Sequence, residues 1–158
     1  MTTNNPFTAY GIEHLSPSTC NLFTASPAMF VLNKCMKKSN KVGAAAHRGT
    51  AVETGVVHGL MTGAPDSECI QIANEQFWNL TALTDDPARE KEKAAVPEMV
   101  KIGLAELRPY GTPSSTQGKI EYRFDSIAVP FIGFYDVEWD NHHILVDLKT
   151  THALPSKI

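Results

Sequence analysis

Residues 131–150 read FIGFYDVEWDNHHILVDLKT. The run Phe131–Trp139 is rich in aromatic and β-branched residues, and so is the shorter run His143–Lys149. The turn-forming pair Asp140 and Asn141 lies between them, which predicts two strands paired as an antiparallel hairpin. The hairpin predicts that this part of the chain forms a β-sheet rather than helices.

The predicted hairpin contains three residues that could act together in a site, Asp136, Asp147 and Lys149. Successive side chains of a strand point to opposite faces, so Asp147 and Lys149 should share one face while Leu148 points to the other. Neighbouring strands lie about 4.8 Å apart, a spacing at which the carboxylates of Asp136 and Asp147 could share one divalent cation. One face of the hairpin would then bind the cation, while the opposite face, with Leu148, would pack against the rest of the protein.

The remainder of the chain predicts helices first and strands last. Caps, prolines and apolar spacing predict helices over Pro17–Phe23, Pro27–Lys38 and Gly43–Met61, one from Asp66 through Trp78, and one from Asp85 to Arg108 that is interrupted at Pro97. A loop at Pro109–Gly118 leads into strands at Lys119–Ile127, Val129–Glu138 and His143–Thr150. We therefore predict an α/β fold of α+β character, with N-terminal helices followed by a three-stranded, mostly antiparallel meander.

The bulk properties favour one soluble domain. A chain of 158 residues with 42% hydrophobic content can bury a core without staples, so residues 1–158 are expected to form a single domain with residues 1–14 flexible. The polar N-terminus lacks a secretory signal, and no apolar run approaches the roughly 20 residues of a membrane span. We expect a cytoplasmic protein with no membrane contact. Three cysteines without paired spacing predict neither a disulfide framework nor a zinc knuckle.

The chain has a net charge of -3, but one stretch of its N-terminal part is strongly basic. No acidic residue falls between Glu13 and Glu53, whereas five cations do: Lys34, Lys37, Lys38, Lys41 and Arg48. These residues form a candidate phosphate-facing patch for nucleic acid. The alternative is a solvated helix end, because lysines in a last helical turn interact favourably with the helix dipole.

Four segments, in this order, resemble one nuclease family. They are Leu15-Ser16-Pro17-Ser18, Arg48-Gly49-Thr50-Ala51-Val52-Glu53, Gly133-Phe134-Tyr135-Asp136 and Asp147-Leu148-Lys149-Thr150. A lone D-x-K triplet arises often by chance, but four ordered segments are far more specific. The chain resembles the PD-(D/E)XK nuclease superfamily, in particular its RecB-like and lambda-exonuclease-like branches. The resemblance implies a restriction-endonuclease-like core.

The resemblance also implies roles for individual residues. Asp136 and Asp147 are similar to the metal-binding carboxylates, and Lys149 to the lysine that orients or activates the attacking water. Glu53 resembles the helix glutamate of lambda-exonuclease-like members, where RecB-like members commonly carry His. Hard carboxylate oxygens suit Mg²⁺, with Mn²⁺ as the second choice. Asp136, Asp147, Glu53 and Lys149 are therefore the expected catalytic and metal-binding set.

Two further residues are candidates for accessory roles. Glu121 falls where many relatives carry an acid ahead of the G-x-x-D segment, so it is expected either to assist the metal and Lys149 or to face solvent. His47 lies six positions before Glu53, about 600° of helical rotation, so it does not share a face with Glu53 and is only a possible substrate contact. The aromatic residues Phe77, Trp78 and Trp139 are expected in the core or partly in the core, rather than as base-stacking platforms.

Departures from the family pattern limit what the resemblance implies. Relatives with an iron–sulfur cluster have Cys where this chain has Ser26, so no cluster is expected. Relatives also continue past the D-x-K-T strand into a further helix and strand, so the chain looks truncated and its sheet incomplete. An incomplete sheet would favour a homo-oligomer or a recombination partner protein.

The implied function is a divalent-metal-dependent deoxyribonuclease that acts on DNA, expected to be an exonuclease of recombination, repair or phage DNA metabolism. Two other readings stay open. The chain could be a catalytically inactive nuclease-like module that only binds nucleic acid, or an interaction domain unrelated to DNA. The alternative for Asp147 and Lys149 themselves is a same-face surface ion pair, worth about 0–1 kcal/mol.

Overall fold

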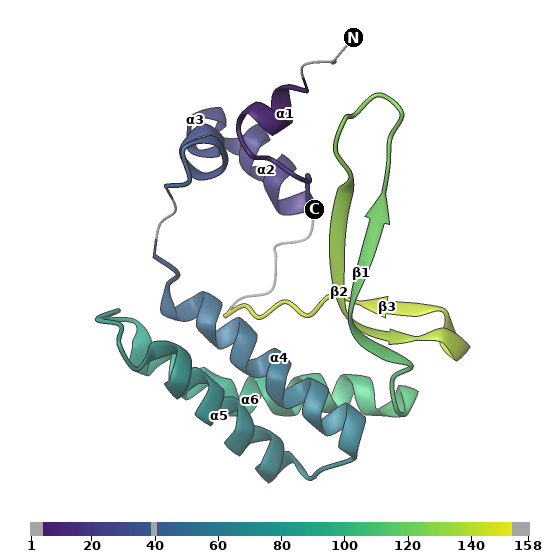
Figure 1. The fold of residues 1–158 in the computed structure, drawn as a ribbon. Helices are drawn as coiled ribbons and strands as arrows, with labels where there is room; N and C mark the ends of the chain where they lie inside the picture. The colour runs from purple at the N-terminus through teal and green to yellow at the C-terminus, as the bar shows by residue number, and fades with distance from the viewer. Residues whose placement is uncertain (1–4, 39–40, 153–158) are drawn as a thin grey trace. The chain divides into compact units, whose positions relative to one another are not determined.

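A computed structural model describes residues 5–38 and 41–152 as helices followed by a three-stranded sheet (Figure 1). The chain forms two compact units, Met1–Lys41 with Lys119–Phe134, and Val42–Gly118 with Tyr135–Ile158. Strands β1 (Ser115–Tyr122) and β2 (Phe131–Trp139) each contribute to both units. The order of elements confirms the predicted α/β class, in which N-terminal helices precede a short sheet.

Helices α2 and α3 of the first unit begin at serine–proline pairs. Ser16 caps α2 (Pro17–Ala25), where its side chain accepts a hydrogen bond from the Thr19 amide at 3.2 Å. Ser26 caps α3 (Pro27–Phe30) in the same way. Proline suits the first helical position because its missing N–H needs no partner there. The sequence predicts that the second of these helices runs to Lys38. The observed α-helix ends at Phe30 and continues as a π-helix over Val31–Cys35, so the helical stretch is shorter than predicted.

Part of the segment expected to be flexible has regular structure. A short helix, α1 (Pro6–Ala9), is capped by Asn5. Residues 1–4 of that segment lie outside the described ranges. In the same unit Leu15 forms an isolated parallel bridge with Phe131, which joins the entry to α2 with the start of β2.

Three helices build the core of the second unit: α4 (Ala44–Thr62), α5 (Asp66–Thr81) and α6 (Arg89–Leu107). Glycines allow them to approach closely. A Cβ on Gly55 would lie 2.7 Å from the carbonyl oxygen of Cys69, and a Cβ on Gly59 would lie 2.7 Å from the Leu104 side chain. Small residues on α4 therefore set the distance between α4 and its two neighbours.

Two predictions about local structure are wrong. Helix α6 runs through Pro97 without interruption. The neighbours Val96 and Val100 are fully buried, and this packing outweighs the lost backbone hydrogen bond. The predicted loop at Pro109–Gly118 is also wrong in part, because a 3₁₀ turn occupies Arg108–Tyr110 and β1 already begins at Ser115.

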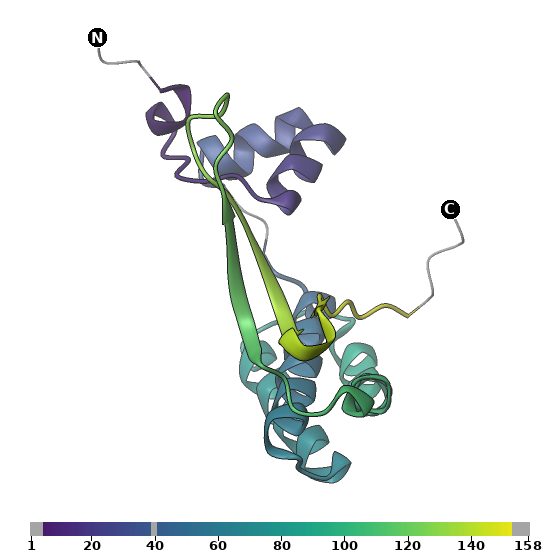
Figure 2. The ribbon, with the colours of Figure 1, turned by 90° about the vertical axis from the view of Figure 1, so that its right-hand side faces the viewer.

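The sheet has the order β1-β2-β3, and β2 pairs antiparallel with β3 (Ile144–Val146). The register aligns Val137 with Val146 and Trp139 with Ile144. Val137 and Trp139 are fully buried in the same core as α4, α5 and α6. Figure 2 shows the β2–β3 end of the sheet beside these helices. The Trp139 indole N–H donates to the Gly111 carbonyl at 2.9 Å, so even this buried polar group is paired. The β2–β3 end of the sheet is thus anchored on the helices.

Replacement of Gly55 by alanine should destabilise the protein despite the better helix propensity of alanine. Overpacking against the Cys69 backbone costs about 1–3 kcal/mol, more than the roughly 1 kcal/mol gained from propensity. Denaturant unfolding measures the difference. In Gly49→Ala on the same helix the new Cβ would meet Thr150 at an ordinary 3.4 Å, so this control should be neutral or stabilising. Equal stability of the two variants would contradict the close-packing account.

Candidate active site

The end of the β2–β3 pairing brings the two predicted aspartates into neighbouring positions. Val137 of β2 pairs with Val146 of β3, so the next residues along the two paired segments are Asp136 and Asp147. Strand β3 ends at Val146, earlier than predicted, and Asp147–Thr150 has no regular secondary structure. A side chain replaces the ladder there, because the Leu148 amide donates a hydrogen bond to the Asp136 carboxylate at 2.5 Å.

Asp147 and Lys149 lie on the face of this segment opposite Leu148. Leu148 packs against the core cluster, whereas Asp147 and Lys149 have exposed fractions of 56% and 76%. The Lys149 ammonium contacts the Asp147 carboxylate directly. Asp136 precedes the buried Val137, so by strand alternation it belongs to the same outer face.

The residues around Asp136 are held to β1. The hydroxyl groups of Ser115 and Tyr135 both donate to the Glu138 carboxylate, at 2.6 and 2.5 Å. The hydrogen bond to Glu138 raises the pKa of the Tyr135 phenol. A Cβ on Gly118 would lie 2.0 Å from the Tyr135 ring, so the ring crosses β1 where no side chain is present. This arrangement fixes β2 on either side of Asp136.

Glu53 lies on α4 and contacts β1. Its carboxylate accepts a hydrogen bond from the Gln117 side-chain amide at 3.0 Å. Gln117 has a φ of 53°, a left-handed conformation that is uncommon for residues other than glycine. Backbone strain of this kind is often found at functional sites. The sequence gives no signal for Gln117, because left-handed residues are recognised mainly where glycine or asparagine occurs.

The three carboxylates do not form one cluster. Among residues 5–38 and 41–152, no three His, Cys, Asp or Glu side chains are grouped so that they could hold a metal ion. Each acid has its own partner instead: Gln117 for Glu53, the Leu148 amide for Asp136, and Lys149 for Asp147. The donor chemistry nevertheless fits a hard divalent cation, since all three groups supply carboxylate oxygens.

Arg48 differs from the other predicted DNA-facing cations because it is buried. Only 4% of its side chain is exposed, and its guanidinium forms an ion pair with Glu92 on α6. The same guanidinium donates to the carbonyl and hydroxyl oxygens of Thr150, at 3.1 and 3.3 Å. Its burial argues against direct phosphate contact. Arg48 instead connects α4 and α6 to the segment that carries Asp147.

Glu92 is a residue that the sequence does not single out, because it is one of several charges at the start of α6. Its burial opposes ionisation, but hydrogen bonding from His152 at 3.0 Å and the charge of Arg48 outweigh this effect. The pKa of Glu92 is therefore lowered. The carboxylate is charged at neutral pH and compensates the buried guanidinium.

The other predicted site residues are distributed over both units. Lys34, Lys37, Lys38 and Lys41 belong to the first unit, where the Lys37 ammonium donates to the Gly11 carbonyl at 3.1 Å. Glu121 also lies there, paired with Lys119 and Arg123, and the hydrogen bond and charge of Lys119 lower its pKa. His47 lies half-buried on α4.

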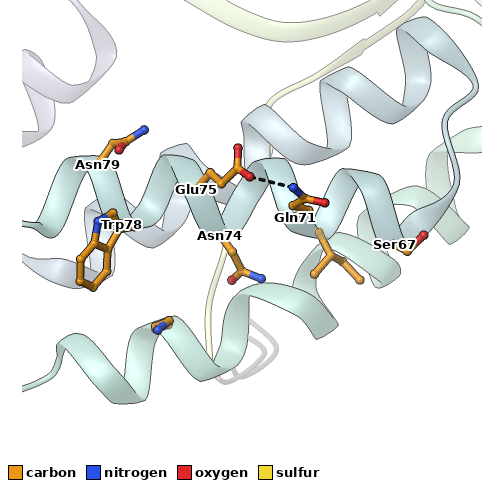
Figure 3. Close-up of a pocket in the computed structure, with 8 residues that line it drawn as sticks. Ser67, Gln71, Asn74, Glu75, Trp78 and Asn79 are labelled. Carbon is orange, nitrogen blue, oxygen red and sulfur yellow. Dashed lines mark hydrogen bonds between the residues drawn. The ribbon is translucent and has the colours of Figure 1, made fainter.

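A shallow pocket on α5 and α6 contains none of the predicted site residues (Figure 3). Trp78 borders it and is 53% exposed, so the expectation of a core or partial-core position for Trp78 is wrong, whereas Phe77 and Trp139 are fully buried. The Arg89 guanidinium lies 4.6 Å from the centre of the Trp78 ring. Gln71 and Glu75 are joined by a hydrogen bond of 2.9 Å along the rim. The exposed ring of Trp78 is therefore in contact with a cation from the neighbouring helix.

A model of the PD-(D/E)XK nuclease superfamily matches residues 14–158. The chain belongs to the PD-(D/E)XK nuclease superfamily. The match includes most of the first unit, the whole of the second unit, all four segments that carry the resemblance, and every candidate catalytic residue. Comparison with curated proteins and with solved structures gives no match. No helix in the described part of this PD-(D/E)XK chain has the length and apolar character needed to cross a membrane.

The buried pair of Arg48 and Glu92 predicts a pH-dependent contribution to stability. The folded-state pKa of Glu92 is below its ordinary 4.5, so the contribution is present above pH 4.5 and is lost as the pH falls through the folded-state value. Glu92→Gln should therefore lower the free energy of unfolding by about 3 kcal/mol at pH 7. The difference from wild type should shrink steadily below pH 4.5.

Urea unfolding of both proteins between pH 3 and pH 7 measures this difference. Glu106→Gln is the matched control, since Glu106 is exposed on the same helix. A Glu92→Gln deficit that stays constant over this pH range would show that the carboxylate charge does not stabilise the fold.

Proposed function

We propose that the chain is a divalent-metal-dependent DNA nuclease of the RecB-like or lambda-exonuclease-like branch, acting as an exonuclease in recombination, repair or phage DNA metabolism. The observation that carries this proposal is the hydrogen bond from the Leu148 amide to the Asp136 carboxylate. It holds the segment with Asp147 and Lys149 beside Asp136, and both of these side chains are exposed. Membership of a superfamily of hydrolytic nucleases gives the reaction class.

Asp136 and Asp147, with Glu53 as a third ligand, would hold the cation. Mg²⁺ is the first choice and Mn²⁺ the second, because all ligands are carboxylate oxygens. A bound divalent ion lowers the pKa of coordinated water and polarises a phosphate oxygen. The chain's own contribution is to present carboxylates from within β2, from just past the end of β3 and from α4, with Gln117 orienting Glu53.

Lys149 would supply positive charge beside the scissile phosphate. Its ammonium group is at the end of a flexible stem and is largely exposed. In the described structure it neutralises Asp147. Beside the scissile phosphate, this ammonium group would stabilise the negative charge that develops during attack by water.

Glu53 favours the lambda-exonuclease-like alternative. It follows Gly49-Thr50-Ala51-Val52 on α4, a place where RecB-like members commonly have His. A third carboxylate increases the negative charge of the site and its preference for Mg²⁺ over softer ions.

DNA is the proposed partner, and the exposed lysines of the first unit are the proposed contacts. Lys37, Lys38 and Lys41 are exposed and Lys34 is half-buried, which suits attraction of a phosphate backbone. The family match over residues 14–158 supports one nuclease domain made of both units. A homo-oligomer or a recombination partner, and action in the cytoplasm of a bacterial or phage-infected cell, belong to the same proposal.

A catalytically inactive module that only binds nucleic acid is the second candidate. It is favoured by one observation, namely that the three carboxylates of the described residues are not grouped as a metal site. Such a module would retain DNA in a salt-dependent way without cleaving it.

Two substitutions test the nuclease proposal. Asp147→Asn should abolish cleavage of linear DNA in Mg²⁺, and Lys149→Ala should lower kcat by about 10²–10³-fold. Both side chains are exposed, so neither change should alter the unfolding midpoint. Lys101→Ala, at an exposed position of α6, should cleave like wild type. Intact DNA with wild-type protein in both Mg²⁺ and Mn²⁺, together with salt-dependent DNA retention, would favour the inactive module.

A further inference from the structure

The Asp147–Thr150 segment lies beyond the end of β3, so no strand ladder fixes its backbone. Two contacts from other elements hold it instead. The Leu148 amide is bound to the Asp136 carboxylate, and Thr150 receives two hydrogen bonds from the Arg48 guanidinium. Lys149 lies between these two anchors.

The Arg48 guanidinium is suited to this task by its planar, forked shape. Nη1 is directed at Glu92 and at His152 Nε2, 2.7 Å away, while Nη2 donates to the carbonyl and hydroxyl oxygens of Thr150. A buried guanidinium is tolerated only where its charge is compensated, and Glu92 compensates it here. A lysine ammonium at this position could keep the ion pair but could not reach both partners in one geometry.

We propose that Arg48 is a positioning residue for the reaction: it fixes Thr150, and thereby the orientation of Lys149 and Asp147, while Glu92 holds the guanidinium in place. This inference rests on the proposed nuclease function. It changes the role of Arg48 from a phosphate contact to a support for the residues that act on phosphate. A catalytic group displaced by about 1 Å can lose about 10²-fold in rate, so a support of this kind affects kcat rather than DNA binding.

The test compares Arg48→Lys with Arg108→Lys. Arg108 is a matched control because its guanidinium also combines a carboxylate, Asp66, with a backbone carbonyl, that of Ala64, near the C-terminal end of α6. In Arg48→Lys, kcat for linear DNA in Mg²⁺ should fall by about 10²-fold with KM unchanged. Arg108→Lys should keep the wild-type kcat.

Amide hydrogen exchange gives a second readout that does not need activity. In Arg48→Lys the amides of residues 148–152 should exchange about tenfold faster, the effect of losing a hydrogen bond from a charged donor. Arg108→Lys should leave this peptide as in wild type. Together, the two readouts separate local positioning from general destabilisation, which would increase exchange across the helices as well.

Three results would overturn the inference: wild-type kcat in Arg48→Lys, a rise in KM that accounts for the whole loss, or unchanged exchange at residues 148–152. Failure of the wild-type protein to cleave DNA is a different result and would refute the proposed function itself. In that case the exchange measurement alone decides whether Arg48 fixes the segment.

Discussion

The hydrogen bond between the Asp136 carboxylate and the Leu148 amide is the constraint on which the candidate site depends. The backbone hydrogen bonds between β2 and β3 stop at Val146, and past this point the Asp136 side chain connects the two segments. Its consequence is that Leu148 stays packed on the core while Asp147 and Lys149 remain exposed on the other face. Alternate residues of this segment therefore have different tasks: Leu148 packs on the core, and Asp147 and Lys149 are the candidate site residues.

The helices supply the rigid base beneath this segment. Val137 and Trp139 are buried among α4, α5 and α6, and glycines on α4 let those helices pack closely. The buried ion pair of Arg48 and Glu92 adds a polar connection from the helices to Thr150. Such a pair contributes little net stability relative to an apolar alternative, but loss of either partner leaves an uncompensated charge. Its value here is geometric, because it links three segments that are distant in sequence.

Much of this arrangement could be predicted from local sequence patterns. The serine–proline caps marked the starts of α2 and α3, and the hairpin turn at Asp140–Asn141 lies where expected, although there it forms a 3₁₀ turn that ends with His143 in a left-handed conformation. Strand alternation correctly separated Leu148 from its charged neighbours. Four short segments in the right order, among them the G-x-x-D and D-x-K-T segments, were sufficient to identify the superfamily.

The features that failed depend on tertiary contacts. Pro97 remains inside α6 because Val96 and Val100 are buried, and Arg48 is buried because Glu92, forty-four residues away, compensates it. Exposed Trp78 is stabilised by the Arg89 guanidinium, a partner that no helical periodicity reveals. The left-handed Gln117 and its contact with Glu53 also have no local signature.

The central claim is that Asp136 and Asp147 bind one divalent cation. A crystal structure with Mn²⁺, with the ion located by its anomalous signal, tests this claim most directly. The account predicts a peak within about 2.0–2.6 Å of one oxygen from each aspartate, with the Lys149 ammonium released from Asp147. Saturating Mn²⁺ without a peak between the two aspartates, or aspartates too far apart to share an ion, would contradict it.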